Sequence, residues 1–576
     1  MTRSRSPTWD SARPVGLEVQ HEVQHAEDED EDEGEAGGDG APDGARGKGR
    51  DDGARAGAAR AERASASRGR MAVVLSGLGL MTDVYDLQVI NLARPLIALE
   101  HRMSAYHESL ITSAAIVGAI VGMVAFGALA DRLGRRAMFL LTALLTTLGA
   151  VASACARASG PAIYAELAAW RFVMGVGIGG EYPLSAANSA EHGGARGARG
   201  GRQVALTYSM MGWGGLLAPL VFLALQLLDL PPAAVWRLGF AVGGAMSAMG
   251  ALLRALLLSD SRAFVAARAE GLAQSVAHGG YVRRLVASLR GYWRPLLGSA
   301  GCWLLFDIYE YGLNLYTSDI LHAAGLARPT SPLDATLGVL ALRLCTIPGY
   351  LGSIPLIATV GRRQTLDWGF ASIGCAFFAL GALWAQMVRT PALFLALFGL
   401  AQVLDNAGCN AATYVIPAEI FPSQMRATCH GASAAAGKVG AAVGSAAFPL
   451  VVAAVGLRGV FLACAAICAL GLALSVMTLP RYDDAIVAGI DEAHAAGGYL
   501  EHLYAHTDGG AWCARGCGPA AGRRAGGAVR LADERGVELG ATADVDERAI
   551  SGGAGPDDGL ERTRGGGVAH RQARHI

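Results

Sequence analysis

An aspartate lies in the middle of an apolar segment, residues 295–320, that is long enough to cross a bilayer. Ionisable residues at that depth are costly and usually belong to a functional site. Trp303, Asp307 and Tyr311 are spaced four apart, so on a helix the indole, the carboxylate and the phenol share one face. We expect this face to line a polar site. The alternative is that the two aromatic rings only pack or lie at the membrane interface.

Other carboxylates that could bind and release a proton also lie in apolar segments. Asp83 and Asp86 are in the first segment, Glu181 is in the fourth, and Asp307 is in the seventh. Arg171 lies in the same segment as Glu181, and because a lone guanidinium in lipid is costly we expect it to pair with Asp83 or Asp86. For these two aspartates the alternative is a solvated helix end.

The elements that must hold these groups are transmembrane helices. Of the 576 residues, 52% are apolar, 17% are charged and 78 are Gly, a composition that soluble domains rarely have. A helix needs about 20 mostly apolar residues to span the hydrocarbon core. The sequence therefore predicts an all-α polytopic membrane protein of about twelve helices. They are expected at residues 71–98, 109–130, 137–156, 162–184, 204–228, 234–258, 295–320, 335–360, 366–387, 391–417, 429–455 and 459–479.

Three polar stretches divide the chain. Residues 1–70 contain the acidic run EDEDEDEGE and a segment rich in Gly, Ala and Arg, which predicts a disordered cytoplasmic tail. Residues 259–294 form a polar central loop between two six-helix halves, 71–258 and 295–480. Residues 481–576 are polar and Gly-rich, which predicts a largely disordered cytoplasmic C-terminal tail.

The distribution of basic residues predicts the orientation. If both termini are cytoplasmic, the basic runs around Arg135, Arg262, Arg362 and Arg426 all fall in inner loops, as the positive-inside rule requires. The outer connections then carry about one basic residue each. A formal net charge of −1 gives no indication of a nucleic-acid partner.

Two loops repeat one another. DRLGRR, residues 131–136, follows the second predicted helix, and GRR, residues 361–363, follows the eighth, which is the equivalent place in the other half. Such duplication is typical of transporters that rock about a midplane site. The pattern GxLxDRxGRR at 127–136 closely resembles the major facilitator superfamily. It indicates the fold but not the substrate.

Longer strings are similar to one family of that superfamily, the phosphate:proton symporters of fungi and plants. The matching strings stand in the same order as in that family. They are TDVYD at 82–86, RFVMGVGIGGEYPLS at 171–185, WLLFDIYEY at 303–311, NAATYVIPAEIFP at 410–422 and HGASAAAGK at 430–438. The resemblance covers about residues 71–480 and leaves both tails unmatched.

The resemblance implies roles for the matching residues. In that family phosphate is bound near the membrane midplane, and the substrate-binding positions here are Tyr182, Trp303, Asp307, Tyr311, Asn410 and Lys438. Hydroxyl, indole, amide and ammonium groups are suitable donors for a tetrahedral oxyanion. A carboxylate accepts a hydrogen bond from dihydrogen phosphate but not from sulfate, which has no proton, so Asp307 would select against sulfate.

The chain departs from the family pattern at the site itself. Glu181 replaces the usual aspartate, and Met211 stands where the family has a glutamine. Glu310 and Asp405 are extra carboxylates at membrane depth, and Cys409 replaces a proline. We expect these changes to affect the affinity, the anion or the coupling ion rather than the fold.

We therefore expect import of inorganic phosphate with protons by alternating access, in the lipid bilayer of the plasma membrane. The alternatives are transport of another small anion or a polar metabolite, or a phosphate receptor with little flux. The sequence contains no catalytic triad, metal cluster or nucleotide-binding loop. Neither an enzyme, a cofactor nor a metal site is expected.

Overall fold

The computed structural model describes residues 43–193, 200–258, 289–315 and 331–505, together with the single residues 265, 320 and 322. These ranges contain helices and short connections, and no strand occurs within them. The first helices are α2 (Asp43–Glu100), α3 (Ala105–Leu133), α4 (Arg135–Ala154), α5 (Ala162–Gly193), α6 (Gly200–Leu227) and α7 (Pro232–Leu257). The later ones are α10 (Trp293–Leu315), α12 (Pro332–Thr359), α13 (Arg362–Ala382), α14 (Trp384–Arg389), α15 (Pro391–Ala407), α16 (Cys409–Glu419), α17 (Arg426–Thr478), α18 (Asp484–Ala488), α19 (Ile490–Ala495) and α20 (Tyr499–Tyr504).

Ten helices in the described ranges are long and apolar enough to span a membrane, with α15 and α16 counted together. One of them, α17, holds the last two predicted spans. Its backbone leaves the helical region between these spans, at Gly456 (φ 67°, ψ 175°). Glycine adopts such a positive φ without a steric penalty, so it allows the chain to turn back there. The seventh predicted span is α10, which is not among the ten and carries Asp307 and Glu310.

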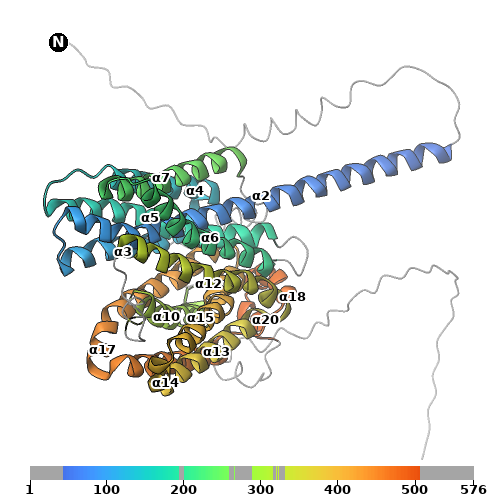
Figure 1. Cartoon of the computed structure of the whole chain (residues 1–576). Coiled ribbons are helices and arrows are strands. Elements are labelled where there is room, and N and C mark those ends of the chain that lie inside the picture. The colour runs from blue at the N-terminus through green and yellow to red at the C-terminus, as the bar shows by residue number, and fades with distance from the viewer. Residues whose placement is uncertain are drawn as a thin grey trace, which may run out of the picture. The chain divides into compact units, whose positions relative to one another are not determined.

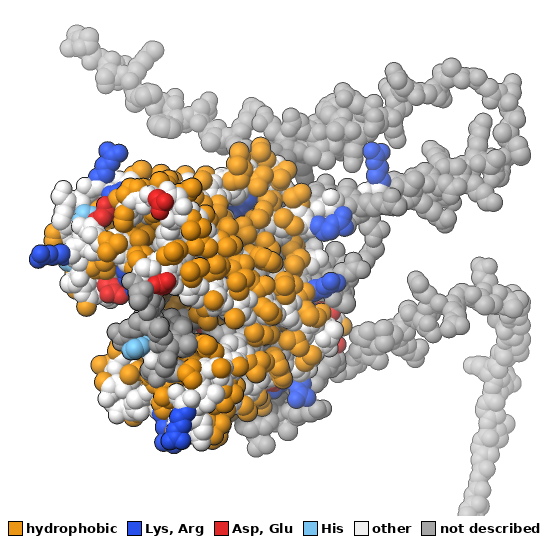
Figure 2. Space-filling model, in the orientation of Figure 1, with side chains coloured by type: hydrophobic (Ala, Val, Ile, Leu, Met, Phe, Trp, Pro, Cys, Tyr) orange, Lys and Arg blue, Asp and Glu red, His pale blue; other side chains and the backbone are white. Residues whose placement is uncertain are grey.

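The helices gather into two groups (Figure 1). The first group consists of α2 to α7, and the second of α10, α12, α13 and α15 to α17. They meet where α3 packs on α17 and where α6 packs on α12. The α3–α17 contact is very close, since a Cβ on Gly431 would lie 2.2 Å from the backbone oxygen of Met123. Figure 2 shows apolar side chains over much of the visible face, with Lys and Arg mostly at its edges.

The termini differ in part from the sequence prediction. The structure has helix from Asp43 onward, where the sequence predicts a disordered tail up to residue 70. Ala and Arg favour helix, so a helix nucleated in the first span can extend into this segment. The short helices α18 to α20 lie at the start of the predicted C-terminal tail. Residues 1–42 and 506–576 and most of the predicted central loop lie outside the described residues.

Candidate functional site

The predicted polar face of α10 meets a lysine from α17. The ammonium of Lys438 lies 3.2 Å from Oδ2 of Asp307 and donates a hydrogen bond of 2.7 Å to the hydroxyl of Tyr311. Lys438 and Asp307 are buried, with 5% and 2% of their surface exposed, whereas Tyr311 is partly exposed. The structure therefore brings three of the predicted binding residues into direct contact, as a buried ion pair beside a reachable phenol.

Aromatic rings surround this pair. The Lys438 ammonium lies 5.8 Å from the ring centre of Tyr182, which comes from α5 in the first helix group. Trp303 is buried one turn before Asp307, with its ring centre 6.4 Å from that of Tyr414 and 5.6 Å from that of His430. Residue 437 must be small, because a Cβ on Gly437 would lie 2.4 Å from the indole of Trp303. Residues of both helix groups thus meet at the Lys438 ammonium.

The sixth predicted binding residue, Asn410, lies at the start of α16. It is partly exposed, and its amide donates to the side-chain oxygen of Asn406 at 3.0 Å. Among the described residues no hydrogen bond joins Asn410 to Asp307, Tyr311 or Lys438. The structure therefore leaves Asn410 outside the hydrogen-bonded group.

Glu181 forms a second buried ion pair, with Arg254 of α7. Nη1 of Arg254 lies 2.5 Å from Oε1 of Glu181, and the hydroxyl of Thr142 donates to the same oxygen at 3.0 Å. The other terminal nitrogen of Arg254 donates to the backbone oxygen of Leu75 at 3.3 Å. A Cβ on Gly79 would lie 1.6 Å from this guanidinium, so α2 passes close to it.

Arg254 was missed in the sequence analysis. Its signal was a single guanidinium in the run ALLRALLL at the end of the sixth predicted span, where Glu181 was a possible partner. Asp83 is buried near this pair, and Oδ2 of Asp83 has no hydrogen-bond donor among the described residues. The proton-coupling candidates Asp83 and Glu181 therefore lie in one charged cluster of the first helix group.

The expected ion pair between Arg171 and a span 1 aspartate is not formed in the described residues. Nε of Arg171 instead donates to the backbone oxygen of Ile111 at 2.8 Å, and the guanidinium carbon lies 5.9 Å from the ring centre of Phe240. Asp86 is fully buried and accepts a hydrogen bond of 3.2 Å from Ser247. A carbonyl oxygen and an aromatic face thus take the place of a carboxylate beside this guanidinium. Nη1 of Arg171 has no hydrogen-bond partner among the described residues.

Comparison with known proteins gives the family. The model of the sugar (and other) transporter family matches residues 71–483. This chain belongs to that transporter family. It is similar to "Inorganic phosphate transporter 1-6" of Oryza sativa subsp. japonica, 32% identical over 437 residues, which cover 65% of this chain and 81% of the relative. It is also 32% identical over 474 residues to "Probable inorganic phosphate transporter 1-6" of Arabidopsis thaliana, covering 71% and 91% of the two chains.

Solved structures show that this transporter has the major facilitator fold. The proton:xylose symporter XylE bound to 6-bromo-6-deoxy-D-glucose matches with a TM-score of 0.62 at 18% identity, covering 73% of this chain and 97% of that one. The partially occluded inward-open XylE from E. coli matches with a TM-score of 0.53 at 17% identity, covering 72% and 98%. These matches and the apolar helices confirm the prediction of an all-α multi-pass membrane protein.

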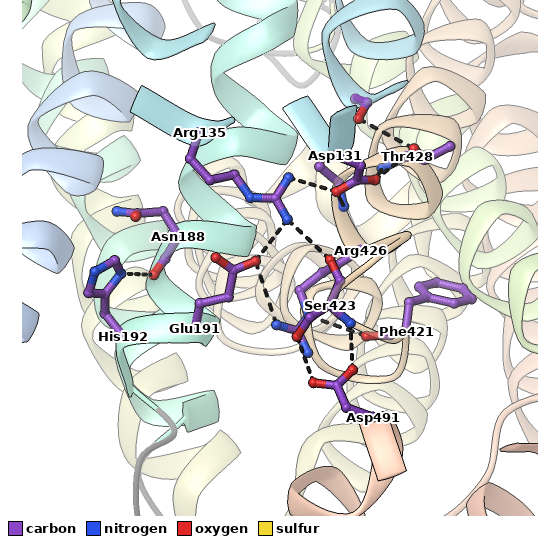
Figure 3. A network of polar contacts seen from close by, with 12 residues as sticks. Asp131, Arg135, Asn188, Glu191, His192, Phe421, Ser423, Arg426, Thr428 and Asp491 are labelled. Atoms are coloured by element: carbon purple, nitrogen blue, oxygen red, sulfur yellow. Dashed lines mark hydrogen bonds and ion pairs between the residues drawn. The ribbon is translucent and has the colours of Figure 1, made fainter. Parts of the chain in front are cut away.

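The transporter is closed at the end that carries the basic loops, which we call the basic end. Arg135 bridges Asp131 at 2.7 Å and Glu191 at 2.8 Å, so it ties α3 to α5 (Figure 3). Asp131 also accepts hydrogen bonds from the backbone nitrogens of Ala427 and Thr428, at 3.2 and 2.7 Å. These are free amides of the first turn of α17, where the helix dipole favours an anion. A carboxylate of one helix group therefore caps a helix of the other.

The helices after the last span pack on the basic end of the second helix group. Arg362 pairs with Glu419 at 2.8 Å and with Asp484, which begins α18. Asp491 of α19 accepts hydrogen bonds of 2.7 Å from both the backbone nitrogen and the hydroxyl of Ser423 (Figure 3). The segment 484–504 is therefore part of the closed basic end, although its sequence resembles a tail.

Proposed function

We propose that this transporter carries inorganic phosphate together with protons across a bilayer by alternating access. The observation that carries the proposal is the buried Lys438, whose ammonium contacts Asp307 and Tyr311 and faces Tyr182 of the other helix group. A fixed cation beside a phenol is a suitable site for a small oxyanion. The curated relatives named as inorganic phosphate transporters support the choice of anion.

The ion pair between Lys438 and Asp307 provides a way to couple the two solutes. While Asp307 is ionised, it forms an ion pair with the ammonium of Lys438 and repels an incoming anion. Protonation of Asp307 removes that charge and leaves the ammonium for phosphate. Loss of the proton on the other side restores the ion pair and favours release. Phosphate and the carboxylate charge thus alternate as partners of one cation.

Asp307 also provides selectivity. A carboxyl group next to the bound anion can accept a hydrogen bond from a protonated phosphate oxygen, whereas sulfate has no proton to donate. Binding sulfate would leave the acceptor unsatisfied in a buried site, which is costly.

Coupling to protons answers an energetic problem. Moving one charge against 100 mV costs about 2.3 kcal/mol, so an anion enters a negatively charged cell only with compensating cations. Besides Asp307, the cluster of Asp83 and Glu181 and the separately buried Asp86 are the proposed proton-binding groups. Arg171 remains a proposed part of this machinery through its charge near Asp86 rather than through an ion pair.

We assign the basic end to the cytoplasm of a plasma-membrane protein, since its arginines fit the positive-inside rule. With that end closed, the structure corresponds to a state whose site is shut off from the cytoplasm. Opening then separates the predicted halves, 71–258 and 295–480, and breaks the capping of α17 by Asp131. Trp303 and Asn410 are proposed as further substrate contacts, which phosphate would reach after the ion pair opens.

Uptake into proteoliposomes tests this function. Purified protein should accumulate radiolabelled phosphate when the outside is more acidic than the inside, and much less without the gradient. Excess unlabelled phosphate should compete, and excess sulfate should not. Saturable phosphate binding without flux under either condition would instead identify a receptor.

A different small anion is the second candidate, and Met211 is the observation that favours it. Met211 is buried in the same apolar cluster as Tyr182 and Trp303, where a thioether gives no hydrogen-bond donor. If a competitor screen of small oxyanions found one that displaced phosphate at far lower concentration than phosphate itself, that anion would be the substrate.

A further inference from the structure

Two tyrosine hydroxyls lie unpaired where the helix groups meet. Tyr208 belongs to α6 of the first group, and Tyr414 belongs to α16 of the second. Each residue is 1% exposed, and neither hydroxyl has a hydrogen-bond partner in the part of the chain that the structure describes. A buried hydroxyl without a partner is costly, and such groups normally bond to a ligand or an ordered water.

Ring contacts place both tyrosines beside the proposed phosphate site. The ring centre of Tyr414 lies 6.3 Å from that of Tyr182 and 6.4 Å from that of Trp303, two of the proposed substrate contacts. The ring centre of Tyr208 lies 5.8 Å from that of Tyr414. Because Tyr182 also faces the ammonium of Lys438, the two tyrosines extend the group of aromatic rings around this cation.

The helix faces that carry these tyrosines also carry predicted binding positions. Tyr208 precedes Met211 by three residues on α6, and Tyr414 follows Asn410 by four residues on α16. Residues at these spacings share one face of a helix. Met211 offers no hydrogen-bond donor, whereas the hydroxyl of Tyr208, one turn away, can both donate and accept.

Other buried tyrosines have bonded hydroxyls. The hydroxyl of Tyr85 donates to the backbone oxygen of Gly239 at 2.9 Å, and that of Tyr164 donates to the backbone oxygen of His101 at 3.0 Å. Among the described residues, the fully buried tyrosine hydroxyls without a partner are those of Tyr208 and Tyr414. The unpaired hydroxyls thus lie beside the proposed site, where a ligand can supply their partner.

We propose that the hydroxyls of Tyr208 and Tyr414 are further substrate-binding groups, each donating a hydrogen bond to the bound oxyanion. The Tyr208 hydroxyl supplies the donor that Met211 lacks. One hydroxyl comes from each helix group, so the anion binds to both groups at once, as it does through Tyr182 and Lys438. The inference rests on the proposed function, because phosphate is the anion that it names.

Two substitutions that remove only the hydroxyl oxygen test this assignment. In Tyr208→Phe and in Tyr414→Phe the dissociation constant for phosphate, measured by isothermal titration, should rise about fivefold, as expected for one neutral hydrogen bond. Thermal unfolding of the ligand-free variants in detergent should show a stability equal to or above that of the wild type, because an unpaired buried hydroxyl has been removed. The matched control Tyr164→Phe loses a bonded hydroxyl, so it should be less stable and bind phosphate normally.

The substitution of the missing glutamine is tested in a combined variant. Met211→Gln in the Tyr208→Phe background should bring the dissociation constant back toward the wild-type value, because the amide replaces the lost donor. No recovery would overturn the idea that Tyr208 takes the place of the glutamine.

Three outcomes would overturn the inference. Unchanged phosphate binding in both Phe variants would do so and leave the proposed function standing. A loss of ligand-free stability as large as in Tyr164→Phe would show that the hydroxyls bond to a structural water instead. Absence of phosphate binding in the wild type would refute the proposed function and the inference with it.

Discussion

The two helix groups each bury an ion pair, and the pairs differ in how firmly they are held. Arg254 and Glu181 are 2.5 Å apart, Thr142 donates to the same Glu181 oxygen, and the Leu75 carbonyl accepts from Arg254. Oε2 of Glu181 has no hydrogen-bond partner among the described residues. Lys438 lies 3.2 Å from Asp307, and among the described residues its other hydrogen bond is to Tyr311. Arginine is a rigid fork that stays charged, whereas lysine is a point charge on a flexible stem. The first pair is therefore held more firmly, and the second suits exchange of one anionic partner for another.

Breaking the fixed pair is expected to have the largest effect on stability. Arg254→Met leaves Glu181 buried without its cation, which should lower the free energy of unfolding by about 3–5 kcal/mol. Thermal unfolding in detergent measures this. The double variant Arg254→Met/Glu181→Gln removes the stranded charge and should recover much of the loss. Equal stability of the single variant and the wild type would contradict a structural role.

Removing Lys438, the cation of the second pair, should affect phosphate binding more than stability. Lys438→Ala leaves Asp307 free to protonate, but phosphate loses its charged donor, at a cost of about 2–3 kcal/mol, or roughly 30-fold to 150-fold in dissociation constant. Isothermal titration of purified protein with phosphate gives this constant. Arg458→Ala, an exposed position on α17, is the matched control and should bind normally. An unchanged constant in Lys438→Ala would move Lys438 to a structural role.

Replacing Met211 with the glutamine that the phosphate:proton symporters have at this position should have the smallest effect. Met211→Gln adds a donor and an acceptor, and one neutral hydrogen bond contributes about 1 kcal/mol, or several-fold in affinity. The half-saturation concentration for phosphate uptake should fall, with sulfate still excluded. No change would mean that residue 211 does not face the substrate. Faster transport of another solute would identify a different natural substrate.

The helical pattern predicted some parts of the site, because they depend on one helix. Trp303, Asp307 and Tyr311 share a face of α10 as their spacing requires, and that face meets Lys438. Local periodicity is sufficient for such predictions.

Other parts depend on how helices pack, which one sequence does not specify. Arg171 has a carbonyl and an aromatic ring as neighbours where a carboxylate was expected. The ion pair between Glu181 and Arg254 joins residues on two different helices that are far apart in the chain. In the tails, composition predicted disorder, but the helices at 484–504 are held by specific partners such as Ser423. These partners could not be predicted without knowing how the helices pack.

The most direct test of the account is proton-driven phosphate accumulation by Asp307→Asn. The asparagine keeps the shape of the side chain but cannot ionise, so it cannot re-form an ion pair with Lys438 when phosphate is released. The account predicts that phosphate binding and phosphate–phosphate exchange across proteoliposomes persist, while accumulation driven by a pH gradient is lost. Asp367→Asn removes a carboxylate of the same half that lies with Arg363 and Ser475, away from the site, and should retain gradient-driven accumulation. Wild-type accumulation by Asp307→Asn would contradict the account.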